Sequence, residues 1–321
     1  IAERATSATG LGGSDPGYQT LDRFRMNIGG TSAGRFTMAQ DSSAPEGFAK
    51  SLKLSCTTAD TSIAADELLS LQQRIEGQNL QMFAKGTTSA KPYAVSFYVK
   101  GNASATYTCE LEDGDNSRRV AKEFSVTTDW VRVELSFPKD TTGAFDDDNA
   151  LSLSLNIFLH GGSNFTSGTF SANTWESISN TTRLSDSQTS FFDSTDRTFF
   201  ITGIQLEVGQ NPTEFEHEPH ERTEMKCYRY YYKATTYTLS MANASTTGYT
   251  FRQERTQQHS MPVRMRNSPT FTAVESIKLL SSGSVTLNGA VDRITIVPSA
   301  YAGDLPSDNY WYGGYTADAE L

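Results

Sequence analysis

Along much of the chain, apolar and polar residues alternate over short stretches, which is the pattern of half-buried β-strands. In Leu151–Leu155, leucine alternates strictly with serine, so three leucines would lie on one sheet face and two hydroxyls on the other. Trp130–Phe137 is a second such stretch, and it ends at Pro138 because proline cannot donate to a β-ladder. The same pattern predicts strands at 35–39, 51–56, 80–84, 94–100, 105–111, 121–126, 130–137, 151–159 and 197–208.

One segment, Ala65–Glu76, departs from this alternation. Leu68, Leu71 and Ile75 are spaced as on one helix face, acidic residues precede them, and Gly77 follows as a stop. We therefore expect a short helix that caps one end of a β-sandwich. Nine strands with turn signals and this helix predict an all-β fold, a jelly-roll β-sandwich over residues 31–216.

The rest of the chain divides by composition. Residues 1–30 are rich in Gly, Ser, Thr and Asp and predict an extended N-terminal arm, and 161–194 reads as a long loop. Residues 217–232 are charged at first and predict a helical linker. A second, smaller β-domain is expected over 233–321, with a hairpin turn at Asn288–Gly289.

Composition excludes several classes of protein. The 321 residues include 36 Ser and 39 Thr, a polar but weakly charged mixture that favours β-structure. A net charge of −10 argues against a nucleic-acid partner, because binding to phosphates depends on Lys and Arg. The longest compact apolar run, Ala94–Val99, is far too short for a membrane helix, so no membrane insertion is expected.

The chain ends and the cysteines add three smaller expectations. No secretory signal is visible, and a start at Ile1 predicts that further chain precedes it. Cys56, Cys109 and Cys227 form no C-x-x-C pair, so we expect buried, reduced thiols.

Motifs that carry chemistry are few. The sequence has no G-x-S-x-G elbow, H-E-x-x-H helix, P-loop or G-x-G-x-x-G fingerprint, so we predict no catalytic residue and no cofactor. His217 and His220 stand among glutamates that could ligate a metal, but Pro219 lies between them. Asp146, Asp147 and Asp148 could hold Ca²⁺, although they lack the spacing of a calcium loop and also suit a hydrated turn.

Saccharide binding requires an exposed aromatic face with carboxylate or amide groups beside it. Two places have this composition, and their residues are Trp175 with Asn173 and Glu176, and Tyr310 and Trp311 with Asp308. The alternative is that these aromatic side chains belong to the core or to a subunit interface.

Three further segments carry a resemblance to a known family. Phe199–Gly209, Thr213–His217 and Cys227–Tyr231 resemble a signature of bacteriophage tail-fibre and related virion proteins, in which a carbohydrate-binding-like jelly roll ends in this strand. Shorter matches occur at Leu71–Gly77, Ser96–Lys100, Met261–Thr270 and Ala317–Leu321, all in the order of the family. Tyr228 stands where the family usually has Gln, and Glu218 where a basic residue is common.

The signature residues have a structural interpretation. Alternation would place Ile201, Gly203, Gln205 and Glu207 on one face of a strand, with an apolar face opposite that closes the sandwich. We expect structural roles for the set Gln205, Glu207, Gly209, Phe215, Glu216, Cys227, Arg229 and Tyr230.

The resemblance implies a receptor-binding tail-fibre protein. Such a protein would be a non-catalytic virion component, assembled in the host cytoplasm, that attaches to a host surface glycan. It would be a homotrimer that contacts other virion tail proteins. Two alternatives stay open, a purely structural virion protein such as a capsid decoration or tail adaptor, and a polysaccharide depolymerase with a pair of carboxylates.

Overall fold

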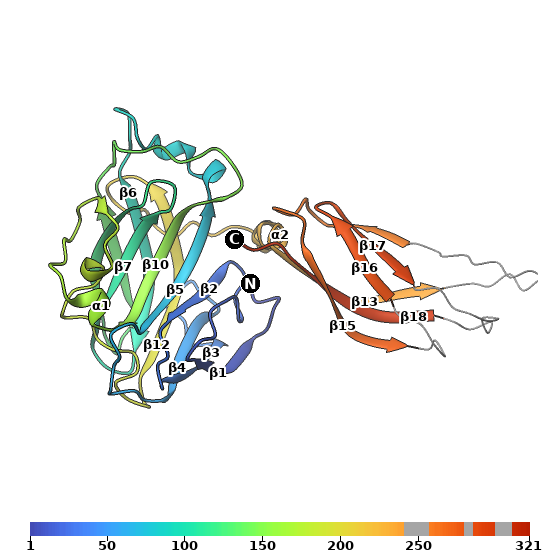
Figure 1. The fold of residues 1–321 in the computed structure, drawn as a ribbon, viewed down its shortest axis with the longest axis horizontal. Helices are drawn as coiled ribbons and strands as arrows, with labels where there is room; N and C mark the ends of the chain where they lie inside the picture. The colour runs from blue at the N-terminus through green and yellow to red at the C-terminus, as the bar shows by residue number, and fades with distance from the viewer. Residues whose placement is uncertain (241–256, 279–284, 299–309) are drawn as a thin grey trace, which may run out of the picture. The chain divides into compact units, whose positions relative to one another are not determined.

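The computed structural model describes residues 1–240, 257–278, 285–298 and 310–321. Two compact units comprise mainly residues 2–217 and 218–320. Both are built almost entirely of antiparallel strands, which confirms the all-β fold class (Figure 1). No helix in the described part of the chain is long and apolar enough to cross a membrane.

The larger unit is a jelly-roll β-sandwich of two six-stranded sheets, between which the chain crosses repeatedly (Figure 1). In spatial order, sheet A consists of β1 (Ser7–Gly12), β3 (Arg35–Asp41), β4 (Ser51–Thr58), β12 (Thr198–Val208), β6 (Tyr93–Gly101) and β9 (Val131–Phe137). Sheet B consists of β11 (Glu176–Ser177), β8 (Arg118–Val126), β7 (Ala105–Asp113), β10 (Leu151–Gly161), β5 (Leu68–Glu76) and β2 (Phe24–Gly29).

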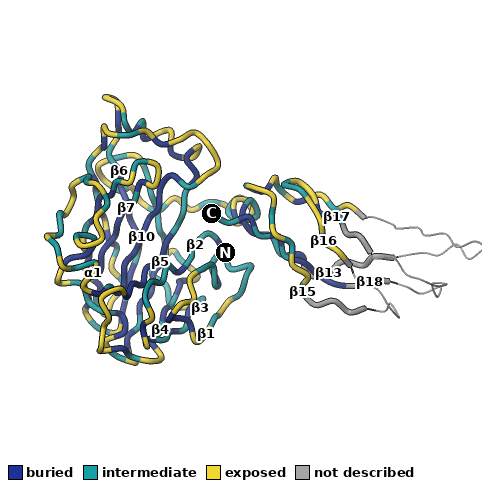
Figure 2. The backbone as a smooth tube through the Cα atoms, in the orientation of Figure 1, coloured by how far each residue is buried: buried dark blue, intermediate teal, exposed yellow. Residues whose placement is uncertain are grey.

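The core lies between the two sheets and follows the alternation of the sequence. In β10, Leu153 and Leu155 point into it, as the Leu–Ser pattern predicted, and Ile157 does so as well, whereas Leu151 is only half-buried and lies outside this core. The intervening Ser152 and Ser154 are also buried, because the outer face of sheet B is covered by other segments. Figure 2 shows the central strands of the sandwich as buried along most of their length. Cys56, Cys109 and Cys227 are buried and form no disulfide bond, as expected.

The helix predicted over Ala65–Glu76 is wrong, because most of this segment is strand β5, which lies between β10 and β2. Leu69 and Leu71 face the core, while Gln72 lies on the opposite face. The backbone of β5 pairs with β10 on one side and β2 on the other, so non-local hydrogen bonds outweigh the helical spacing of three apolar residues. The helical turns of this unit are short, namely η1 (Gly77–Asn79), η2 (Gln81–Phe83), α1 (Ser163–Thr166) and η3 (Asn180–Thr182). The η2 turn replaces the strand predicted at 80–84.

The N-terminal arm predicted over residues 1–30 is also part of the sandwich. β1 pairs with β3 and β2 pairs with β5. Leu11 and Met26 are buried in the core, Met26 completely. The Gly-rich composition of the segment thus reflects its turns, whereas its few apolar residues determine where it packs.

The smaller unit begins with the helix α2 (His220–Tyr228), within the segment predicted to be helical. Two three-stranded sheets follow, β13 (Tyr231–Ser240), β18 (Tyr310–Asp318) and β15 (Thr270–Lys278) in one, and β14 (Gln257–Ser260), β17 (Arg293–Pro298) and β16 (Val285–Ala290) in the other. Their small core includes Met261, Met265, Ile294, Tyr315 and Ala317.

The predicted turn at Asn288–Gly289 lies instead inside β16, which pairs with β17 across a turn at residues 291–292. A Cβ atom at Gly289 would come within 2.7 Å of the Phe271 ring and 2.5 Å of the Arg293 carbonyl oxygen. This glycine therefore serves close packing, and not the chain reversal that the Asn-Gly pair suggested.

Candidate functional site

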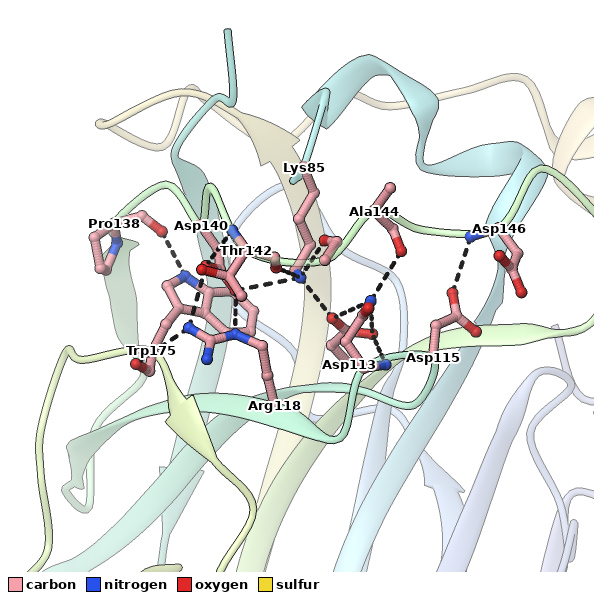
Figure 3. Close-up of polar contacts among 12 residues, drawn as sticks. Lys85, Asp113, Asp115, Arg118, Pro138, Asp140, Thr142, Ala144, Asp146 and Trp175 are labelled. Atoms are coloured by element: carbon pink, nitrogen blue, oxygen red, sulfur yellow. Dashed lines mark hydrogen bonds and ion pairs between the residues drawn. The ribbon is translucent and has the colours of Figure 1, made fainter. Parts of the chain in front are cut away.

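Trp175, the first predicted saccharide platform, is half-buried and makes its contacts inside the protein (Figure 3). Its indole N–H donates to the carbonyl oxygen of Pro138 at 2.7 Å. The Tyr93 ring lies 5.6 Å away and the Lys85 ammonium group 5.5 Å from the indole ring. These contacts attach the loop that carries Trp175 to the end of the sandwich.

The two residues predicted to assist Trp175, Glu176 and Asn173, lie in different environments. Glu176 accepts a charge-assisted hydrogen bond from Arg119 at 2.6 Å, and the Arg119 side chain is almost fully buried. Asn173 is exposed and has a left-handed backbone conformation with φ 59°. The carboxylate of Glu176 is thus engaged in an ion pair within sheet B.

Lys85 is the centre of a buried ionic cluster beside Trp175 (Figure 3). Its ammonium group has four oxygen partners, the carboxylates of Asp113 at 2.6 Å and Asp140 at 3.2 Å, and the carbonyls of Thr142 at 2.7 Å and Gly143 at 2.8 Å. Burial raises the pKa of Asp140, but hydrogen bonds from Arg118, Thr142 and Lys85 outweigh burial and hold this pKa below its usual value. The cluster connects the β7–β8 turn to the loop after β9.

The predicted calcium residues lie in an exposed turn next to this cluster. The backbone N–H of Asp146 donates to the Asp115 carboxylate at 3.0 Å, and the Asp148 carboxylate accepts from the backbone N–H of Ala150 at 2.8 Å. Asp147 is exposed. In the part of the chain that the structure describes, no group of three or more His, Cys, Asp or Glu side chains is arranged to hold a metal ion. This turn is thus stabilised by the carboxylate of Asp148 within it and by that of Asp115 from the β7–β8 turn.

The second predicted platform lies in the smaller unit. Tyr310 and Trp311 begin strand β18, opposite Ser240 and Leu239 of β13, and Asp308 lies outside the described residues. The side chains of Tyr310 and Trp311 lie outside the described part of the structure, so this site stays a prediction.

The signature residues Gln205 and Glu207 act as a clamp on the segment that follows β12. The Glu207 carboxylate accepts from the backbone N–H of Thr213 at 2.6 Å and from its hydroxyl at 2.8 Å. The Gln205 side-chain oxygen accepts from the backbone N–H of Glu216 at 2.8 Å. Although partial burial raises the pKa of Glu207, these hydrogen bonds from Thr213 outweigh it and lower the pKa.

The clamp also positions Phe215, whose ring lies 5.0 Å from Phe48. Phe48 packs over Gly203, where a Cβ atom would come within 2.7 Å of its ring. Gly209, at the end of the signature strand, donates its backbone N–H to the Pro92 carbonyl oxygen at 3.1 Å. The sequence motif is therefore explained by local structure.

The remaining signature segments meet one another within the smaller unit. The backbone N–H of Arg266 donates to the Arg229 carbonyl oxygen, and its side chain donates to the Ala319 carbonyl oxygen, both at 2.8 Å. The backbone N–H of Ala319 in turn donates to the Tyr230 carbonyl oxygen at 2.8 Å. Cys227 and Tyr230 are buried. Three motifs far apart in the sequence thus form one backbone junction.

The bulge at Gly203 changes which residues of β12 face outward. Gly203 has φ 62°, and the pairing with β6 shifts register between Thr202 and Gln205. Ile201 therefore points into the core, on the same side as Ile204, and is not on the face of Gln205 as alternation predicted. Before the bulge, the outward residue is Phe200.

Phe200 is part of a row of side chains that crosses the outer face of sheet A. In register, Lys53 of β4 lies opposite Phe200, and Phe200 lies opposite Lys100 of β6. Trp130 comes just before β9, and its ring centre is 6.1 Å from that of Phe200. The Lys53 ammonium group lies 5.2 Å above the Phe200 ring, and the Lys100 ammonium group lies 5.5 Å from Phe200 and 5.9 Å from Trp130. We call Lys53, Phe200, Lys100 and Trp130 the lysine–aromatic row.

Polar groups border the lysine–aromatic row. On one side, Thr37, Ser55 and Thr198 lie opposite one another across β3, β4 and β12. On the other side, Asp41 is 3.7 Å from Lys53, and the Ser43 hydroxyl is 3.4 Å from Lys100. Trp130 and Lys100 are partly exposed, and Phe200 lies beneath them, 8% exposed. An aromatic surface with hydroxyl, carboxylate and ammonium groups around it meets the requirements for binding a sugar.

The outer face of sheet B has a different character, because its charges are paired with one another. Glu110, which is fully buried, and Glu112 both bind Arg183 from the 161–194 segment. The side-chain amide of Asn156 donates to both carboxylates. Burial raises the pKa of Glu110, and the charge and hydrogen bonds of Arg183 act in the opposite direction without cancelling this effect. This pair of carboxylates is occupied within the protein.

The larger unit is thus a jelly-roll β-sandwich with one covered and one partly open sheet face.

No family model and no curated protein matches the chain. Among solved structures it is similar to a family 11 carbohydrate-binding module from Clostridium thermocellum in complex with a β-1,3-1,4-mixed-linked tetrasaccharide, at 11% identity and a TM-score of 0.31, over 67% of this chain and 100% of that one.

Two further structures are similar to the same degree. A family 30 carbohydrate-binding module of a Clostridium thermocellum cellulosomal cellulase has 13% identity and a TM-score of 0.32, over 64% of this chain and 99% of that one. The enzymatically active domain of tailspike protein 4 from bacteriophage CBA120 has 12% identity and a TM-score of 0.31, over 58% of this chain and 19% of that one.

Proposed function

We propose that this protein binds a glycan without catalysis and that it serves a bacteriophage virion as a receptor-binding tail-fibre protein. The observation that carries the binding function is the lysine–aromatic row on sheet A. Trp130 offers a ring to the C–H face of a sugar, and the flanking hydroxyl, carboxylate and ammonium groups can hydrogen-bond its hydroxyls. The virion role is supported by the order of the sequence motifs that resemble tail-fibre proteins.

Assembly as a homotrimer belongs to the same proposal. A single shallow site on a sheet face binds a sugar weakly, whereas three linked sites convert weak contacts into useful avidity. Three copies on a fibre would present three such faces to a cell surface. In the cell, the protein would be assembled in the host cytoplasm together with other tail proteins.

The depolymerase alternative needs two carboxylates that are free to act on a glycosidic bond. Glu110 and Glu112 form a carboxylate pair on sheet B, but Arg183 and Asn156 bind both. The geometry thus favours binding over hydrolysis. The structural alternative, a decoration or adaptor protein, would leave the row on sheet A without a ligand.

The test is binding of the purified chain, displayed at high valency on beads, to a glycan array and to host cells. We expect retention on a defined group of glycans and no release of reducing sugar from them. Absence of any binding at high valency would favour the structural alternative, and released reducing ends would favour the depolymerase. Light scattering tests the trimer, since a particle of 35.2 kDa would contradict it.

A further inference from the structure

We infer that the lysine–aromatic row selects an acidic saccharide, one that carries a carboxylate on its ring, as uronic acids do. This inference rests on the proposed glycan binding and names the class of ligand. It is carried by the position of two ammonium groups beside a single aromatic surface on an otherwise acidic protein.

The two lysines are held close together by the strand register. Lys53 and Lys100 lie on either side of Phe200 in adjacent strands, and neighbouring strands are about 4.8 Å apart. Both ammonium groups lie within 5.5 Å of the Phe200 ring centre, so both lie above the sheet and not along its edge. A ligand that stacks on Trp130 would therefore lie close to the ammonium groups of both Lys100 and Lys53, which follow one another across the strands.

The charges of these lysines are only partly compensated within the protein. Lys53 has one carboxylate nearby, that of Asp41 at 3.7 Å, and its side chain is 32% exposed. Lys100 has the hydroxyl of Ser43 at 3.4 Å, and among the residues that the structure describes it forms no ion pair. By contrast, Lys85 is fully buried among four oxygens. The lysines of the row thus retain capacity to bind an anion.

A carboxylate on a sugar ring fits this arrangement. The ring keeps a C–H face for Trp130, while its carboxylate accepts hydrogen bonds from Lys100 or Lys53. The protein carries a net charge of −10, so the attraction is local and does not extend to any polyanion. This favours sugars that present charge and an apolar face together.

The experiment uses the full chain immobilised on beads and three acidic polysaccharides, namely polygalacturonate, hyaluronan and polysialic acid. Each is paired with its carboxyl-reduced form, which has the same backbone without the charge. We expect at least one acidic form to be retained and its reduced form to bind at least tenfold more weakly, with retention falling as salt rises. Dextran sulfate serves as a polyanion without a carboxylated sugar.

Variants assign the effect to the row. Lys53→Met and Lys100→Met keep the apolar stems and should each weaken binding about fivefold, and the double variant should bind more weakly than either. The arginine variants at both positions should retain binding of the acidic form, which shows that charge and not folding is responsible. Lys122→Met is the matched control, because Lys122 lies 5.9 Å over the Phe137 ring but belongs to sheet B. It should bind as the unmodified protein does.

The outcomes separate this inference from the proposed function. Equal binding of acidic and reduced forms, or unchanged binding by the double Met variant, overturns the acidic class and leaves glycan binding in place. Equal or stronger retention on dextran sulfate indicates binding to any anion and also overturns it. If neither these polymers nor the glycan array are bound, the proposed function itself fails.

Discussion

The two outer faces of the sandwich use similar residues for opposite purposes. On sheet B, Arg183 and Arg119 are covered and their charges are matched by Glu110, Glu112 and Glu176. On sheet A, the lysine–aromatic row lies at the surface, and only Lys53 has a carboxylate nearby. The covered ion pairs of sheet B hold loops in place, whereas the partly exposed lysines of sheet A remain available to a ligand. The difference arises from what crosses each face, because the 161–194 segment covers sheet B.

The largest expected effect concerns the covered face. Arg183→Met leaves Glu110 and Glu112 with much less positive charge, and breaking a buried ion pair costs about 3–5 kcal/mol. We expect the free energy of unfolding in urea to fall by about this amount while glycan binding by the folded protein stays unchanged. Arg132→Met on sheet A is the matched control, since its partner Glu134 is half exposed and the loss should be about 1 kcal/mol. Equal losses for both variants would contradict the contrast between the two faces.

The next effect concerns the open face. Trp130→Ala removes the proposed platform, and loss of a central aromatic anchor costs about 2 kcal/mol of binding, roughly 30-fold in affinity. The melting temperature should change little, because Trp130 is only partly buried. Trp175→Phe, by contrast, removes the hydrogen bond to Pro138 and should lower stability without changing affinity. A Trp130 variant that folds and binds normally would remove this residue from the site.

A smaller effect is expected at the clamp beyond the bulge. Glu207→Gln weakens two charge-assisted hydrogen bonds from Thr213 and should cost about 1–2 kcal/mol. The pKa of Glu207 is lowered in the folded state, so its contribution is present above pH 4.5 and is lost as pH falls through the folded pKa. Hydrogen exchange should report the change at the amide of Thr213, with the Gly114 amide as an unaffected reference. Unchanged protection at Thr213 would show that the clamp is not needed.

The smallest effect is a pH dependence on sheet B. Burial lowers the pKa of His160 below 6.5, although the hydrogen bond that its ring donates to the Glu67 carboxylate at 3.0 Å acts in the opposite direction. Below pH 6.5 the unfolded chain takes up a proton that the folded one does not, so stability falls until the folded pKa is reached. His160→Gln should remove this part of the slope of unfolding free energy against pH. Glycan affinity, measured on the same samples, should not change with pH in the same way. If the unfolding free energy of the His160→Gln variant depends on pH as that of the unmodified protein does, His160 is not the group responsible.

Alternation in the sequence predicted the sandwich because most strands are apolar on one side only. It failed at β5, where the pairing that decides the structure lies in β10 and β2, far away in the sequence. The alternation failed again at Gly203, because the bulge shifts the register of β12. The residues before it, such as Ile201, therefore face the opposite side of the sheet from the one that alternation predicted. Neither long-range strand pairing nor a local bulge can be predicted from the residue pattern of a single sequence.

The candidate site was missed for a related reason. Trp130 is out of phase with Val133, Leu135 and Phe137, which face the core, so the alternation contained a signal that would have placed it on the outer face. The lysines could not be placed, because strand order in space decides which of them become neighbours. Trp175 has the composition of a sugar site, but only the structure reveals that Pro138 and Lys85 occupy it.

The four oxygens around Lys85 have a consequence for durability. A bound ion can be diluted away or taken up by a chelator, but an ammonium group attached to the backbone cannot leave. The loops that Lys85 joins should therefore keep their conformation in citrate or EDTA as well as in calcium-rich solution, because this connection does not depend on a supply of ions.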